Sequence, residues 1–306
     1  MTRDLGIRLL HTIMLGCSVW PVAVSGDIAV TWLGVAGLHI SDGETAILID
    51  PYITRISFSD YIGARKVASD RQLVADWIHR HKVHNVRAVL VSESHFDHSL
   101  DAAYFADLTG APLVGSTSTA NIGRGVGLLE EQIRIVPFGH QEQIGKFSIT
   151  FMESRHTPII GNHVPDDGFI DEPLRQPANP HDFKMGGHYS YLIQHPDGNL
   201  ITHATPFDDL RGRNLDKLNI KAIFMSVLAR RNTEDFLRRV VDPVNPAILY
   251  PIHCDNFFAK LPAQPKDLKL SLLARIPGLI RTVSRRSSQY DVRKLELFNP
   301  VSIHGI

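Results

Sequence analysis

The chain has 306 residues, and its 32 basic and 32 acidic side chains give no net charge when histidine is neutral. This balance excludes the strongly basic composition that favours nucleic acid or another polyanion as a partner. The length allows a large core in one or two domains. Cysteine occurs only at Cys17 and Cys254, which excludes a disulfide-stabilised scaffold.

Residues 1–26 have the pattern of a secretory signal peptide. Basic residues precede an apolar stretch, 12–24, that is too short to span a bilayer, and small residues follow it. We therefore expect cleavage near Ser25 or Gly26, a mature domain at 27–306, and export to the periplasm or the medium. The alternative is an N-terminal helix or strand that packs on the domain, which would leave the protein in the cytoplasm.

Alternating strands and helices are predicted along the rest of the chain. Apolar runs rich in β-branched residues indicate strands, and amphipathic segments with capping residues indicate helices. The expected strands are 28–33, 36–40, 46–50, 86–91, 112–115, 132–136, 147–153, 190–194, 199–203, 221–225 and 247–250. The expected helices are 69–78, 101–108, 121–129, 206–217 and 232–241. This order, in two similar halves, favours an α/β fold: a four-layer αββα sandwich in a single domain.

The segment 92–98 carries the strongest chemical signal of the chain. It places Glu93, His95, Asp97 and His98 directly after the strand 86–91, so that a rigid strand end delivers four metal-binding side chains into one loop. Imidazole nitrogen and carboxylate oxygen suit zinc, iron or manganese. The alternative is a polar loop that contains two histidines by chance, and the further histidines downstream argue against it.

This segment resembles the His-x-His-x-Asp-His signature of the metallo-β-lactamase superfamily, with Glu93 where the first histidine is usual. Three more segments resemble motifs of that family and occur in the family's order: 46–51, 153–158 and 250–253. The resemblance covers roughly residues 28 to 258. It implies the αββα fold and a metal-dependent hydrolase, but the family includes lactamases, lactonases, phosphodiesterases, thioesterases and nucleases. Its nucleases usually add a large second domain, for which this chain has no room, so we expect no nucleic-acid substrate.

The resemblance also implies two divalent metal ions, with zinc expected and manganese or iron as alternatives. It assigns the ligands in two sets: Glu93, His95 and His156 for one ion, and Asp97, His98 and His253 for the other. Asp97 is also expected to act in catalysis by orienting the attacking water. Asp50 is expected to be structural. Cys254 follows a ligand directly, but adjacent strand residues point to opposite sides, so we expect it to be packed and inert.

The sequence departs from the family pattern at two positions. Glu93 replaces a histidine, and Ala204 stands where many members have an aspartate that bridges the two metals. His203 could substitute for that aspartate or donate a hydrogen bond behind the ligands. Because one carboxylate is added and one is lost, the charge of the site is unchanged. We therefore expect a two-metal site, and a single-metal site is the alternative.

The segment 158–187 has little periodicity and many prolines and glycines, and we interpret it as a lid over the metal cleft. The alternative is a surface loop without function. Within and just after it, the candidate substrate contacts are His163, Phe169, His181, Phe183 and His188. Of these we expect His188 to be catalytic, by donating a hydrogen bond to a substrate oxyanion; support of the ligands is the alternative.

The tail 266–286 is apolar and basic, so it could lie on an anionic membrane surface; a helix that closes the domain has the same pattern. For the whole chain, the expected reaction is attack of metal-activated water on an ester, lactone or lactam of a small molecule. Segments 49–51 and 253–258 look closer to the sugar-phosphate lactonase and N-acyl-phosphatidylethanolamine phospholipase branches, so a phosphodiesterase acting on a lipid-like substrate is an alternative. A further alternative is a non-catalytic, metal-binding member of the family, because Glu93 and Ala204 depart from the family's usual ligands.

Overall fold

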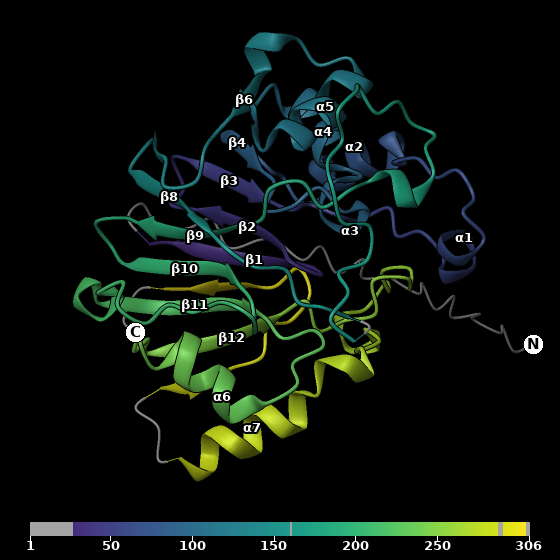
Figure 1. Ribbon diagram of the computed structural model, residues 1–306. Coiled ribbons are helices and arrows are strands. Elements are labelled where there is room, and N and C mark those ends of the chain that lie inside the picture. Colours follow the sequence, from purple (N-terminus) through teal and green to yellow (C-terminus); the bar gives the residue numbers. More distant parts are fainter. Residues whose placement is uncertain (1–26, 160, 287–289, 304–306) are drawn as a thin grey trace, which may run out of the picture.

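Two β-sheets stack face to face in the centre of the molecule, and helices cover the outer face of each (Figure 1). The computed structural model describes residues 27–159, 161–286 and 290–303. Within these residues, each sheet has seven strands. The predicted α/β fold with four αββα layers is therefore confirmed.

The first sheet comes from the N-terminal half of the chain plus one late strand, in the order β14-β1-β2-β3-β4-β5-β6. Pairing is antiparallel from β14 to β3 and parallel from β3 to β6. The strands are β1 (Ala29–Gly34), β2 (Gly37–Ser41), β3 (Ala46–Ile49), β4 (Val86–Leu90), β5 (Leu113–Gly115), β6 (Ile133–Ile135) and β14 (Pro300–Ser302).

The second sheet comes from the C-terminal half, in the order β13-β12-β11-β10-β9-β8-β7. Pairing is antiparallel from β7 to β10 and parallel from β10 to β13. The strands are β7 (Gln141–Ile144), β8 (Phe147–Glu153), β9 (Tyr189–Gln194), β10 (Asn199–Ala204), β11 (Ile220–Ser226), β12 (Ile248–Ile252) and β13 (Asp291–Val292).

Helices α2, α4 and α5 cover the first sheet, and α6 and α7 cover the second (Figure 1). The α-helices are α1 (Phe58–Ile62), α2 (Arg71–Arg80), α3 (Phe96–Ser99), α4 (Ala102–Thr109), α5 (Thr117–Val126), α6 (Thr233–Phe236) and α7 (Ile276–Arg285). The short 3₁₀ and π turns are η1 (Glu130–Gln132), η2 (Pro180–Asp182), η3 (Leu215–Leu218), η4 (Leu237–Val241), η5 (Pro265–Asp267) and η6 (Leu272–Ala274).

The structure corrects three of the helix predictions. The predicted helix over 206–217 is wrong: this segment forms turns, with the positive φ angles of Gly212 and Asn214, before the short turn η3. The helix expected at 121–129 begins earlier, at Thr117, because Ser116 caps it by accepting a hydrogen bond from the amide of Thr119. The tail helix begins only at Ile276, so its proline lies in the first turn, where proline is tolerated.

The apolar face of α7 packs against the domain, since Ile276, Leu279 and Val283 are buried. Within the described part of the chain, no helix has the length and apolar character needed to cross a bilayer. Contact of the tail with a membrane surface stays a prediction. The expected signal peptide, 1–26, lies outside the described residues.

The site sits at one edge of the sandwich because several strands end or begin there. The parallel strands β3 and β4 end at this edge in the first sheet, and β10, β11 and β12 do so in the second. The carboxyl ends of parallel strands meet at the same edge of a sheet, where ligand sites form. Strand β9 runs the other way and begins beside the end of β8, where the amide of Ser154 donates to the carbonyl of His188 at 3.0 Å.

Candidate metal centre

The candidate ligands come from both sheets and meet between them. Glu93 and His95 lie in the loop after β4, and Asp97 and His98 form the first turn of α3. His156 follows β8, and His253 follows β12. Apart from His156, which is partly exposed, all of these side chains are buried.

The structure groups these six side chains in two sets of three. Within each set, one ligand atom of every residue lies within 4.8 Å of the others. The sets are Glu93, His95 and His156, and Asp97, His98 and His253. They are the same two sets that the family resemblance implied. That they bind metal stays a prediction.

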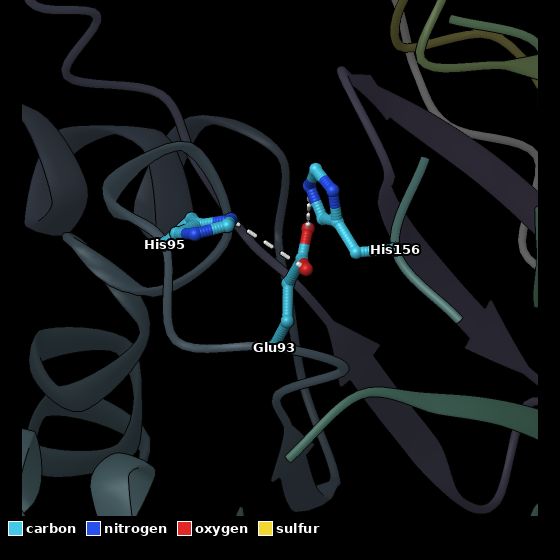
Figure 2. A group of neighbouring side chains, drawn as sticks. All are labelled: Glu93, His95 and His156. Carbon is cyan, nitrogen blue, oxygen red and sulfur yellow. Dashed lines mark ion pairs between the residues drawn. The ribbon is translucent and has the colours of Figure 1, made fainter. Parts of the chain in front are cut away.

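The carboxylate of Glu93 lies at the centre of four imidazoles. Its Oε1 atom is 3.0 Å from Nε2 of His98 and 3.5 Å from Nε2 of His156. Its Oε2 atom is 3.5 Å from Nδ1 of His95 and 3.3 Å from Nε2 of His188. Figure 2 shows how His95 and His156 approach different oxygens of this carboxylate.

These atoms fit a bound cation. Ligand atoms about 2.0–2.1 Å from a tetrahedral zinc ion lie roughly 3.3 Å from one another, which is the spacing around Glu93. Glu93 Oε2 and His98 Nε2 are buried and have no hydrogen-bond partner among the described residues. A cavity of about 30 Å³, enough for an ion or a water, lies between Glu93, His98, His156, His188 and His253. Buried polar atoms without partners carry a free-energy cost that a cation would remove.

Asp50 orients His98 from behind. Its Oδ2 atom is 2.7 Å from Nδ1 of His98, while the amide of Ser92 donates to Oδ1 at 2.7 Å and the Ser92 hydroxyl donates to Oδ2. Burial alone would raise the pKa of Asp50, but the imidazoles of His98 and His203 hold it below its ordinary value. An ionised Asp50 accepts the Nδ1 proton of His98, so Nε2 is the nitrogen that faces the cavity and would bind a cation there. The expected structural role of Asp50 agrees with these contacts.

His95 is oriented by the loop 158–187. Its Nε2 atom is 3.4 Å from the carbonyl oxygen of Asp166, which can only accept a hydrogen bond. Nε2 therefore carries a proton, and Nδ1 is the nitrogen that faces Glu93. The carboxylate of Asp166 is in turn held by the Tyr61 hydroxyl and by Nδ1 of His181, each at 2.9 Å.

His203 belongs to neither set. Its Nε2 atom donates to the carbonyl of Ala36 at 2.8 Å and lies 3.2 Å from Oδ2 of Asp50. Of the two roles left open for His203, this geometry matches hydrogen bonding behind the ligands. Ala204 is fully buried and offers only a methyl group.

The electrostatics of the site follow from burial and from the carboxylates. Burial favours a neutral His98, but Glu93 and Asp50 raise its pKa well above the ordinary value. Burial would raise the pKa of Glu93, but His156 and His188 hold it well below. Burial lowers the pKa of His188 to about 3, so this ring is neutral and keeps a lone pair.

The structure places the other candidate substrate contacts in different surroundings. Phe183 is fully buried in the core, so its predicted substrate contact is wrong. His181 is occupied by Asp166 and by the carbonyl of Tyr61, at 2.9 and 3.0 Å. Phe169 and His163 are exposed. The loop lies against helix α5, since the amide of Leu174 donates to the carbonyl of Asn121 and the amide of Ile170 to the hydroxyl of Ser118.

Cys254 points away from the metal cavity. It is buried, and it lines a separate apolar cavity of about 380 Å³ together with Trp32 and Leu268. Burial and the neighbouring Asp255 raise the pKa of its thiol to about 12, which leaves it protonated and unreactive. The expectation of a packed, inert cysteine agrees with this position.

Comparison with known proteins identifies the family. A family model described as the beta-lactamase superfamily domain matches residues 29–253. The chain belongs to the beta-lactamase superfamily. A curated relative from Anaeromyxobacter sp. (strain K), named a metal-dependent hydrolase, is 24% identical over 263 residues, which are 83% of this chain and 84% of the relative.

Two solved hydrolase structures share the fold at low sequence identity. An isothiocyanate hydrolase from Delia radicum gut bacteria has a TM-score of 0.57 and 14% identity, and the match covers 89% of this chain and 98% of that one. A metallo hydrolase from the archaeon Ignicoccus hospitalis has a TM-score of 0.56 and 15% identity, with 90% and 98% covered. At this identity the likeness extends to the fold alone.

Proposed function

We propose that this member of the beta-lactamase superfamily is a metal-dependent hydrolase that binds two divalent ions, zinc first, and cleaves an ester, lactone or lactam of a small molecule. The observation that carries the proposal is the pair of ligand sets around a small buried cavity, with polar atoms that lack partners among the described residues. The curated relative named a metal-dependent hydrolase supports the same reaction class.

The reaction divides between the ions and the chain's own residues. When bound, the ions would polarise the substrate oxygen and lower the pKa of water toward 7. Asp97 supplies a base beside them: its Oδ2 atom is 3.3 Å from Nε2 of His253. Burial would raise the pKa of Asp97, but His98 and His253 lower it below its ordinary value, so the carboxylate is ionised and can accept a proton from the attacking water.

The surroundings of the site favour a carbonyl substrate over a phosphodiester. Among the described residues that line the small cavity, there is no lysine or arginine to pair with a phosphate. Aromatic rings stand beside the ligands instead: the Phe257 ring is 5.6 Å from the ring of His253 and 4.4 Å from that of Phe258, and both phenylalanines are partly exposed. Such a wall suits the apolar part of a small neutral substrate.

Two alternative functions are tested beside this one. A phosphodiesterase would have to rely on bound ions, in place of basic side chains, to hold the phosphate oxygens. A non-catalytic metal-binding protein is supported by the loss of the usual aspartate at Ala204.

Hydrolysis assays separate these three functions. Rates are measured with p-nitrophenyl acetate, nitrocefin, a γ-lactone and bis-p-nitrophenyl phosphate, before and after chelation and zinc reloading. We expect zinc-dependent hydrolysis of a carbonyl substrate that is lost in His98→Ala and retained in His84→Ala, which changes an exposed histidine just before β4. Hydrolysis of bis-p-nitrophenyl phosphate alone would favour the phosphodiesterase. The absence of any hydrolysis by metal-loaded protein would favour the non-catalytic metal-binding protein.

A further inference from the structure

We propose that Glu93 is the carboxylate that bridges the two metal ions and that His188 is an additional ligand of the first ion. Glu93 would supply the bridging carboxylate that is missing at Ala204, and His188 would supply the imidazole that is missing where Glu93 replaces the usual first histidine. This inference rests on the proposed two-metal site and deepens it.

The position of the Glu93 carboxylate supports a bridge because it reaches both ligand sets. Oε2 lies 3.5 Å from Nδ1 of His95, in the first set. Oε1 lies 3.0 Å from Nε2 of His98, in the second set. A carboxylate has two oxygens with outward lone pairs, so it can bind one ion through each. The carboxylate of Glu93 therefore reaches ligand atoms of both sets at once.

His188 completes three imidazoles around the first ion. Its Nε2 atom is 3.3 Å from Oε2 of Glu93, a ligand-to-ligand spacing, and its ring is 5.8 Å from the ring of His156 across the same cavity. The side chain is only 7% exposed, and its Nδ1 atom has no hydrogen-bond partner among the described residues. The first set then offers Nδ1 of His95, Nε2 of His156 and Nε2 of His188, besides the shared carboxylate.

The backbone holds His188 in this place. The carbonyl of His188 accepts the amide of Ser154 at 3.0 Å, which fixes the start of β9 against the end of β8. Gly186, two residues earlier, has φ of +67°, and a Cβ there would lie 2.7 Å from Cβ of Ser118. The chain therefore passes close to α5 and turns the following histidine inward.

Asp50 and His203, two other polar residues near the cavity, are already occupied. The carboxylate oxygens of Asp50 accept hydrogen bonds from Ser92 and His98. His203 donates its Nε2 proton to the carbonyl of Ala36. Among the described residues that line the cavity, Glu93 is the one carboxylate, so it is the residue able to take the place of the missing aspartate.

Metal content and magnetic coupling test the assignment directly. The full chain is loaded with Mn²⁺, its content is measured by plasma mass spectrometry, and its spectrum is recorded by electron paramagnetic resonance. We expect two equivalents and the multiline signal of a coupled pair in the unchanged protein. Glu93→Gln should lose the coupling. His188→Ala should keep one tight equivalent and bind the other at least about 100-fold more weakly, since even indirect ligand contacts are worth about 10–100-fold.

Matched variants keep the test decisive. His84→Ala, at an exposed histidine outside both ligand sets, should behave like the unchanged protein, and circular dichroism should show that all variants are folded. The combined variant Glu93→His with Ala204→Asp restores the family pattern, and in that background His188→Ala should no longer weaken metal binding. If it weakens binding to the same extent there, His188 does not compensate for the changed positions, and the proposal fails.

The remaining outcomes distinguish this inference from the proposed function. Two coupled ions that persist in both Glu93→Gln and His188→Ala would overturn the inference and leave the hydrolase proposal intact. One ion in the unchanged protein would overturn the bridge. No ion at all would overturn both.

Discussion

Arg55 and Asp255 form a completely buried ion pair, with 2.9 Å between Nη2 and Oδ2. The pair joins the segment after β3 to the segment after β12, two residues beyond His253. The second oxygen of Asp255 accepts the amide of Val35 at 2.8 Å, and the amide of His253 donates to the carbonyl of Val35. One ligand of the second set is therefore anchored to the first sheet through this pair.

Replacement of the arginine of this pair should destabilise the fold. Arg55→Leu would leave Asp255 as an unpaired buried charge, for which we expect a loss of about 3–5 kcal/mol in the free energy of unfolding. Urea unfolding of chelated protein measures it. The double variant Arg55→Leu with Asp255→Leu removes both charges and should lose less than the single variant. An equal or larger loss would show that the effect arises from packing and not from the unpaired charge.

Neutralisation of Asp50 should weaken metal binding without removing a ligand. Asp50→Asn keeps the shape of the side chain but removes the charge that holds the Nδ1 proton of His98. We expect the affinity for zinc to fall about 10–100-fold. Competition with a chromophoric chelator measures this affinity. Unchanged affinity in a folded variant would contradict the assigned role of Asp50.

The loop 158–187 should depend on Asp166 for its contact with His95. Asp166→Ala removes the acceptor of the Tyr61 and His181 hydrogen bonds. We expect faster cleavage of the loop by trypsin and a fall of about 10-fold in zinc affinity. Asp167→Ala changes the exposed neighbour and serves as the control. If both variants behave alike, the contact between the Asp166 carbonyl and His95 does not orient the ligand.

His39 should make the fold sensitive to acid. Burial and repulsion from His81 lower its pKa to about 4, against an ordinary value of 6.5. As the pH falls below 6.5, the unfolded chain takes up a proton that the folded chain does not, so stability falls between pH 6.5 and 4. The full effect is about 3 kcal/mol for this residue.

Urea unfolding of chelated protein between pH 7 and 4 tests this pH dependence, because chelation separates it from metal release. His39→Leu should flatten the curve, whereas His84→Leu, at an exposed position, should not. A curve as steep in His39→Leu as in the unchanged protein would assign the acid sensitivity to other groups.

Sequence reasoning predicted most of the fold for a physical reason, whereas the two candidate ligand sets came from the family resemblance. Buried strands have a strong local signal, and the ligands follow strand ends directly, so 86–98 could be interpreted without its partners. The proximity of His188 to Glu93 had no local signal, because it depends on how β9 begins beside β8. The short strands β7, β13 and β14 were missed because edge strands of two to four residues show too little periodicity.

The false helix at 206–217 shows how local propensity was outweighed. Asp208 accepts the amides of Thr205 and Arg155 and the hydroxyl of Ser154, so it ties this segment to the end of β8. A side chain that satisfies neighbouring amides competes with helix formation.

The ligand sets also have a mechanical consequence, since they draw on both halves of the chain. Residues 93–98 extend from the first sheet, whereas His156 and His253 extend from the second. A bound cation would therefore cross-link two segments that are distant in sequence. Because only the folded chain presents these ligands together, each tenfold rise in free zinc above the dissociation constant should add about 1.4 kcal/mol of resistance to unfolding. Thermal scans across a zinc series would reveal a melting temperature that climbs with the supply of metal.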